Sequence, residues 1–249
     1  MCVAGLEKHE EFANFVLDLQ DRICRTAETA DGKGKFIYDK WDRGEGEGYG
    51  ITRVLEGGNL WEKAACSVSV VRGKLSQDRA KAMSSRGRDA KAGDVYAAAA
   101  CSLVFHSASP MVPTFRADVR HFQLESGVGW YGGGADLTPY YLFDQDAEDF
   151  HRFYKVQYTH TQTHTHTHTY IRKYIYIHTY VYICVCVCVC VCICVYIYNI
   201  KAVCDAHDPV AYERFKKWCD DYFFIPARKE HRGVGGLFFG AQSQTKAFT

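Results

Sequence analysis

Hydrophobic residues near the start of the chain recur at intervals of three and four. This spacing places them on one face of an α-helix. The residues are Phe12, Phe15, Val16, Leu19 and Ile23. The pair Asp31-Gly32 follows, and a glycine just past the last periodic residue commonly ends a helix. The pattern therefore predicts an amphipathic helix that ends near Asp31.

Three later segments have apolar or alternating character and are bracketed by turn residues, as β-strands are. These segments are Ala65–Val71, Ala98–His106 and Phe115–Leu124. In the last one, Arg116, Asp118 and Arg120 stand two residues apart, so a strand would carry all three on one face.

Two further helices are predicted at Asp144–Lys155 and Asp208–Tyr222. The second carries one apolar stripe, which we assign to core packing rather than to a cofactor site. The stripe consists of Phe215, Trp218, Cys219 and Tyr222. Strands and helices do not alternate as they do in parallel βαβ folds. We therefore predict an α+β fold, with a large and mostly antiparallel sheet flanked by helices.

The glycine-rich segment Gly44–Gly50 reads GEGEGYG. It fits neither GxGxxG nor GxxxxGK[ST], the two patterns of nucleotide-binding loops. We interpret it as a mobile loop beside Arg53.

The stretch Trp130–Tyr141, WYGGGADLTPYY, places one carboxylate where chemistry can use it. Glycines free the backbone, so we interpret Gly132–Gly134 as a flexible turn that leads to Asp136, before the rigid corner at 137–139. An Asp between apolar walls is desolvated, which raises its pKa and makes it a useful base. On spacing alone, a glycine-rich turn capped by Asp fits equally well. The aromatic residues expected to form the walls are Trp130, Tyr131, Tyr140 and Tyr141.

The composition is that of an ordinary soluble globular protein, with 47% hydrophobic and 24% charged residues among 249. This length suits one large domain or two small ones. The net charge of +1 gives no support for a nucleic-acid partner. The first residues, MCVAGLEKHEEF, lack the features of a targeting peptide. We expect a cytoplasmic location, with chloroplast or mitochondrion as the alternative if a targeting peptide is missing.

Twelve cysteines raise the question of disulfides or metal binding. Six of them lie in one alternating run within residues 184–194. The other six are scattered without CxxC spacing, so we interpret them as reduced, partly buried thiols of an intracellular protein. They are Cys2, Cys24, Cys66, Cys101, Cys204 and Cys219.

The segment Val156–Lys201 differs from everything around it, because it consists largely of Thr-His and Val-Cys repeats. The dinucleotide repeats ACACAC and GTGTGT, which are typical of introns, encode such pairs. The first codon of the segment begins with GT, the last can end with AG, and its 46 residues preserve the reading frame. We predict a translated intron, which cDNA sequencing across the junction tests.

Three other interpretations of this segment stay open. The His-rich tract could bind a metal. The uncharged run Val181–Tyr198 is long enough to suggest a membrane span. Strict Val/Cys alternation could also pair as an aggregating strand. If the segment is an intron, no integral membrane segment is expected.

Several long strings together resemble the oxygen-dependent coproporphyrinogen III oxidase family. The string GGGADLTP is similar to its signature. The strings FVLDLQDRIC, RVLEGGNLWEKA, PTFRADVRHF and KKWCDDYFFIPARKEHRGVGGLFF follow the order of that family. The likeness covers nearly all of the chain outside Val156–Lys201 and the last ten residues. It implies the same α+β fold that the hydrophobic pattern predicts.

The resemblance implies that two propionates of coproporphyrinogen III are oxidatively decarboxylated to vinyl groups by O2. The product would be protoporphyrinogen IX, for haem or chlorophyll, and the family forms homodimers. Because the reduced tetrapyrrole is electron-rich enough to react with oxygen itself, we expect no cofactor and no metal. The alternatives are a non-catalytic tetrapyrrole-binding paralogue and an inactive fragment of a gene model.

The resemblance also assigns roles to individual residues. Asp136 matches the Asp that contacts the pyrrole nitrogens and serves as base, and Arg120 joins it in the expected catalytic set. Arg228 and Arg232 match carboxylate-binding arginines. We expect His151 to make a helix contact rather than to act in catalysis. The other expected substrate-binding residues are Ser102, His106, Arg116, Asp118, Val119, Gly133 and Gly134.

Two positions depart from the family pattern. Arg116 stands where many members have a His that is assigned as proton donor, and Ala227 stands where they have another His. Of a four-His metal set proposed for bacterial members, only His106 and His151 remain, so no metal site is expected. Arg116 cannot donate a proton near neutral pH. Either another residue donates the proton, or Arg116 has a binding role.

The carboxyl end departs from the family as well. Gly240–Thr249 replaces a helical segment and a strand of the family, so we expect an aberrant tail and an incomplete sheet. The predicted organisation is one domain formed by residues 1–155 and 202–239. Residues 156–201 interrupt this domain, and residues 240–249 follow it.

Overall fold

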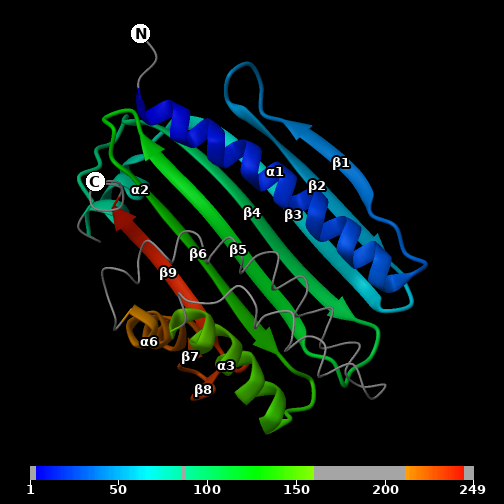
Figure 1. The fold of residues 1–249 in the computed structure, drawn as a ribbon. Coiled ribbons are helices and arrows are strands. Elements are labelled where there is room, and N and C mark those ends of the chain that lie inside the picture. Colours follow the sequence, from blue (N-terminus) through cyan, green and yellow to red (C-terminus); the bar gives the residue numbers. More distant parts are fainter. Residues whose placement is uncertain (1–3, 86–87, 160–210, 244–249) are drawn as a thin grey trace.

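The computed structural model describes residues 4–85, 88–159 and 211–243 of the chain (Figure 1). The strands are β1 (Ile37–Asp42), β2 (Gly48–Glu56), β3 (Trp61–Lys74), β4 (Val95–Ser107), β5 (Thr114–Leu124), β6 (Gly129–Thr138), β7 (Phe224–Ile225), β8 (Glu230–His231) and β9 (Gly236–Ser243). The helices are α1 (Ala4–Asp31), α2 (Gln77–Ser84), α3 (Asp144–Thr159) and α6 (Ala211–Phe223).

Seven strands form one antiparallel sheet in the order β1-β2-β3-β4-β5-β6-β9, while β7 and β8 form a separate ribbon. Helix α1 crosses one face of the sheet (Figure 1). Helices α3 and α6 pack beside β9, at the edge farthest from β1. The predicted α+β fold with a flanked antiparallel sheet is therefore confirmed.

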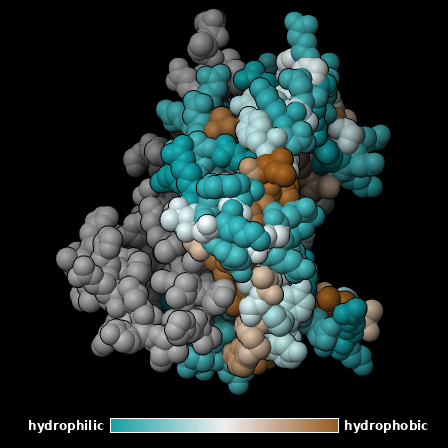
Figure 2. Space-filling model, turned by 90° about the vertical axis from the view of Figure 1, so that its right-hand side faces the viewer, coloured by the Kyte–Doolittle hydropathy of each residue, from teal (hydrophilic) through white to brown (hydrophobic). Residues whose placement is uncertain are grey.

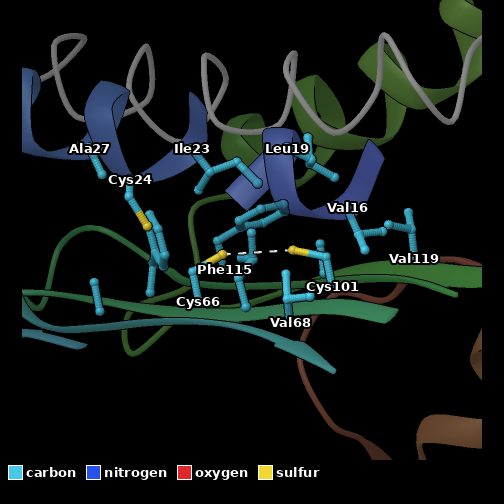
Figure 3. Close-up of a cluster of buried hydrophobic side chains, with 14 of the residues drawn as sticks. Val16, Leu19, Ile23, Cys24, Ala27, Cys66, Val68, Cys101, Phe115 and Val119 are labelled. Atoms are coloured by element: carbon cyan, nitrogen blue, oxygen red, sulfur yellow. Dashed lines mark hydrogen bonds between the residues drawn. The ribbon is translucent and has the colours of Figure 1, made fainter. Parts of the chain in front are cut away.

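The main core lies between α1 and the middle of the sheet. Its apolar side chains come from α1 and from the sheet face beneath that helix (Figure 3). Sγ of Cys66 lies 3.8 Å from Sγ of Cys101 within this core. Burial of such apolar surface is the dominant stabilising contribution to folding. The labelled core residues are Val16, Leu19, Ile23, Cys24, Ala27, Cys66, Val68, Cys101, Phe115 and Val119.

The end of α1 is joined to the β2–β3 turn by one buried carboxylate. Asp31 accepts hydrogen bonds from the backbone N–H groups of Gly34 (2.6 Å), Asn59 (3.1 Å), Leu60 (2.8 Å) and Trp61 (3.0 Å). Burial by itself would raise the pKa of Asp31, but these donors outweigh it and hold the pKa well below its usual value. The carboxylate therefore fixes two distant segments together.

The elements predicted from periodicity are confirmed, and β3, β4, β5 and α3 extend beyond the predicted ranges. The first helix does end at Asp31, and the three predicted strands lie within β3, β4 and β5. The helix predicted at Asp144–Lys155 lies within α3, and α6 covers the described part of the helix predicted at Asp208–Tyr222. Four strands of the main sheet were missed, namely β1, β2, β6 and β9.

Two predictions, the mobile glycine-rich loop and the aberrant tail, need correction. Residues Gly48–Gly50 of the predicted mobile loop belong to β2, and only the residues before them form the turn that follows β1. The expected aberrant tail also begins inside the sheet, because Gly240–Ser243 continues β9 and pairs with β6. Backbone pairing with a neighbouring strand stabilises both segments, although neither has a strand-like side-chain pattern.

The surface on the β1 side is mostly hydrophilic, with small groups of hydrophobic side chains (Figure 2). Ile37 and Tyr38 of β1 are among the exposed apolar residues. None of the described helices combines the length and the hydropathy needed to span a bilayer. Most of the repeat segment, including the run Val181–Tyr198 and the His-rich tract, lies outside the described residues.

Candidate active site

Along strand β5, charged side chains on one face of the sheet alternate with apolar side chains on the other face. Arg116, Asp118 and Arg120 line a cavity of about 520 Å³ on the face opposite α1. Ala117 and Val119 belong to the core instead. The prediction that the three charged residues share one face is confirmed, because side chains alternate along a strand.

The glycine run that follows lies in the extended strand β6, so the prediction of a flexible turn is wrong. β6 pairs with β5 on one side and with β9 on the other, and this pairing holds Gly132–Gly134 extended. Gly134 stands opposite Asp118 and lines the cavity. Because it has no side chain, it leaves open space on the sheet at this point. Pro139 has no N–H to donate and follows the end of the strand.

Asp136 lies across from Arg116 in the β5–β6 register. Its side chain is only 5% exposed and contacts two guanidinium groups. Its Oδ2 lies 3.2 Å from Nη2 of Arg232 and 3.7 Å from Nη1 of Arg116. Thr138 lies beside the same oxygen and accepts a 2.8 Å hydrogen bond from Arg116. The carboxylate therefore sits at the meeting point of β5, β6 and the segment before β9.

Burial raises the pKa of Asp136 above its usual value, although Arg232 and Arg116 act in the opposite direction. The expectation that a desolvated Asp stands at this position is thus confirmed. A carboxylate with a raised pKa is a better base than an ordinary Asp. Its neighbours keep it oriented toward the cavity.

Asp118 forms a second acidic position in the same cavity, where it pairs with Arg120. Burial is the main cause that raises its pKa, Arg120 opposes this, and Asp136 adds to the rise. Two carboxylates and three guanidinium groups therefore face one another in a single cavity.

Aromatic side chains from α6 and β9 also line the cavity. We call Trp218, Tyr222, Phe223 and Phe238 the aromatic wall. Tyr222 stacks on Phe238 with 4.9 Å between ring centroids, and Trp218 meets Phe238 edge-on at 5.6 Å. The guanidinium of Arg232 lies 4.1 Å from the ring centroid of Phe223. The site thus combines a charged sheet surface with flat apolar surface.

The sequence of the chain is similar to those of known proteins. The family model described as Coproporphyrinogen III oxidase matches residues 11–180 and 193–249, which is most of the chain. The chain belongs to the coproporphyrinogen III oxidase family.

Curated relatives in this family come from animals and plants. The oxygen-dependent coproporphyrinogen-III oxidase of Drosophila melanogaster is 37% identical over 90% of this chain and 47% of its own length. The mitochondrial enzyme of Homo sapiens is 37% identical over 90% of the chain and 40% of its length. The chloroplastic enzyme of Glycine max is 35% identical over 92% and 49%, respectively. The chain thus spans about half the length of these relatives or less.

The cavity gathers most of the residues expected from the family resemblance. Ser102, Gly134, Asp136 and Arg232 line it together with the three charged residues of β5. The arginine and aspartate positions come from segments almost a hundred residues apart in the sequence.

Four expected residues lie elsewhere. Val119 has its side chain in the core, because the period of two turns it away from its charged neighbours, so this side chain does not line the cavity. Gly133 pairs with Val119 within the sheet and does not line the cavity. The Nδ1 atom of His106 lies 3.1 Å from Oγ1 of Thr114. Arg228 is 72% exposed and lies 3.5 Å from Glu230.

The prediction that nearby aromatic side chains form walls around Asp136 also needs correction. Tyr140 and Tyr141 are exposed, and Trp130 stacks on Phe122 instead of facing the cavity. The stripe on α6 was assigned to core packing, but it divides between core and cavity. Phe215 and Cys219 are buried, whereas Trp218 and Tyr222 belong to the aromatic wall.

Besides Trp218 and Tyr222, sequence reasoning did not assign Phe223, Phe238 or Thr138 to the site. Phe223 and Phe238 lie within the family string KKWCDDYFFIPARKEHRGVGGLFF, so a search for apolar partners of the charged residues could have found them. His151 makes the expected structural contact, with its Nε2 atom 2.8 Å from the carbonyl oxygen of Val234. Among the described residues, no three His, Cys, Asp or Glu side chains are arranged to hold a metal ion.

Proposed function

We propose that this protein oxidatively decarboxylates two propionate side chains of coproporphyrinogen III to vinyl groups. Each propionate loses CO2 and one proton and leaves two electrons, while a C=C bond forms. O2 takes up these two electrons with two protons and becomes H2O2. Family membership and the charges of the cavity support this proposal.

The cavity offers a partner for each part of such a substrate. Guanidinium groups form paired hydrogen bonds with carboxylates, so Arg116, Arg120 and Arg232 would hold propionates. The oxygens of Asp136 would accept hydrogen bonds from pyrrole N–H groups. The aromatic wall would cover a flat face of the macrocycle.

Asp136 is the residue that we assign to proton transfer. In its ionised form it would remove a pyrrole proton, which makes the reduced ring still richer in electrons and more reactive toward O2. Arg116 and Arg232 would orient the carboxylate without themselves exchanging protons. The tetrapyrrole itself supplies the redox chemistry, so the proposal includes O2 as co-substrate and neither a cofactor nor a metal.

One observation carries this proposal: a buried carboxylate shares one cavity with arginines that can bind acidic side chains. An aerobic assay of the full chain with coproporphyrinogen III tests it. We expect protoporphyrinogen IX to form together with H2O2, and no product without oxygen. Binding of tetrapyrrole without oxygen consumption would instead favour the non-catalytic paralogue, for which the Arg at position 116 is the motivating observation.

The proposal extends to assembly and location. We propose a homodimer, as expected from the family resemblance, and light scattering of the purified chain measures it. The mitochondrial and chloroplastic names of relatives support an organellar location. Imaging of the tagged native protein in cells distinguishes that location from the cytoplasm.

A further inference from the structure

All three guanidinium groups of the cavity already have carboxylate partners. Arg116 and Arg232 contact Asp136, and Arg120 pairs with Asp118. Three positive and two negative side chains line the described cavity, which leaves a single excess positive charge. A ligand with several carboxylates therefore meets arginines that are not free.

The two acidic residues differ in their surroundings. Asp136 is 5% exposed and lies between two arginines and a threonine, so it is fixed in place. Asp118 is 29% exposed, and its partner Arg120 is 41% exposed. The more exposed ion pair, Asp118 with Arg120, is the one that an incoming carboxylate can reach and separate.

The backbone around Asp118 does not need this ion pair. Asp118 stands opposite Ser102 in β4 and opposite Gly134 in β6, so pairing on both sides already holds the strand. Gly134 places no side chain beside the carboxylate. Partly exposed ion pairs also contribute little to stability. The Asp118 carboxylate is therefore a group of the cavity rather than a structural support.

We propose that Asp118 competes with the carboxylates of the substrate for the Arg120 guanidinium, and so limits how tightly the cavity holds acidic ligands. This inference rests on the proposed function for the identity of the natural ligand. An ordinary substrate-binding residue loses affinity when it is removed. A competitor gains affinity, so the sign of the effect distinguishes the two roles.

The test measures binding of coproporphyrin III, the stable oxidised tetra-acid, to the full chain by fluorescence. Asp118→Asn keeps the shape of the side chain and removes its charge. We expect its dissociation constant to fall about tenfold, because one opposing charge near the ligand is gone. The tetramethyl ester of the same porphyrin, which has no charged groups, should bind wild type and variant alike.

Two matched variants complete the design. Asp39→Asn changes the net charge equally on exposed β1, at the far edge of the sheet, and should leave affinity unchanged. Arg120→Gln should abolish the gain, so that adding Asp118→Asn to it has no effect. If Asp118→Asn fails to fold, Asp118→Ser removes the same charge and should give the same gain.

A second ligand separates this inference from the proposed function. Glutarate, a plain dicarboxylate, should bind Asp118→Asn more tightly than wild type whatever the natural substrate is. A gain with glutarate but no binding of coproporphyrin III would defeat the proposed function and leave the competitor role standing. Unchanged or weaker binding of both acids to a folded Asp118→Asn overturns the inference.

Discussion

The behaviour of Asp136 depends on a balance between burial and charge. Burial disfavours its ionised form and raises its pKa, whereas Arg232 and Arg116 favour that form. A base acts in its ionised form, so activity must fall as the pH drops through this pKa. The acidic limb of the pH profile of kcat/KM therefore reports the pKa of Asp136 in the free protein.

Replacing Arg232 by Met should move that limb to higher pH. The substitution removes a guanidinium 3.2 Å from the carboxylate, so the ionised form loses a stabilising partner and the pKa rises further. A pH series of kcat/KM measures the shift. The same substitution at Arg152, an exposed position on α3, is the control and should not move the limb. A shift to lower pH in Arg232→Met contradicts the assignment of Asp136 as base.

Asp31 acts on stability rather than on chemistry. Asp31→Ala should lower the free energy of unfolding by about 3 kcal/mol, because several backbone donors lose a charged acceptor. Chemical denaturation measures this loss. Asp39→Ala, at an exposed position of β1, should change the same quantity little.

The contribution of Asp31 also depends on pH. Its pKa is lowered in the folded state, so the unfolded chain takes up a proton first as the pH falls. The stabilisation is therefore complete above the usual pKa of Asp, about 4, and is lost progressively below it. The wild-type and Asp31→Ala stability curves should converge in acid. Curves that stay parallel down to low pH would show that the lowered pKa is not the cause.

At the scale of elements, side-chain patterns predicted the features that depend only on residues close together in the sequence. The alternation in β5 located three cavity residues, since a period of two is a local property of the strand. The glycine run in β6 has no such pattern, and its extended form comes from β5 and β9 on either side. The β6–β9 part of this pairing joins residues about a hundred positions apart, so no local window of sequence contains it.

Helix α6 shows that periodicity alone does not predict which apolar residues become buried. Periodicity identified its apolar stripe, but only the arrangement of α6 beside β9 decides which part is covered. Phe215 and Cys219 are buried, whereas Tyr222 remains 62% exposed at the cavity. The location of binding aromatics therefore required the tertiary structure.

Two tyrosines of similar exposure test the aromatic wall. Tyr222→Ala should weaken binding of coproporphyrin III about tenfold, because a ring that can stack on the macrocycle is lost. Tyr140→Ala should have no effect, since Tyr140 is 65% exposed but lies outside the cavity. Fluorescence titration compares the two. A larger loss of affinity in Tyr140→Ala would instead support the sequence-based prediction that Tyr140 forms a wall of the site.

At the scale of the whole molecule, the site joins the middle strands of the sheet to elements near the end of the described chain. Residues of β4, β5 and β6 meet residues of α6, the β8–β9 connection and β9. All of these lie outside Val156–Lys201. The resemblance of separate strings to one family predicted this meeting, which composition and periodicity alone could not.

Deleting Val156–Lys201 should therefore leave the fold and the cavity in place. The deletion removes only the last turn of α3 from the described elements, and no residue of the cavity. Circular dichroism and coproporphyrin III binding should match those of the full chain. Loss of binding on deletion would contradict the intron interpretation and favour a functional role for the repeats.

The most direct measurement of the central claim is turnover of coproporphyrinogen III by Asp136→Asn beside the wild-type protein. The substitution preserves shape and removes the base, so kcat should fall by about 100-fold or more while coproporphyrin III still binds. Thermal unfolding of both proteins shows that the variant is folded. Undiminished turnover in folded Asp136→Asn would contradict the account, because it would show that the reaction needs no carboxylate at this position.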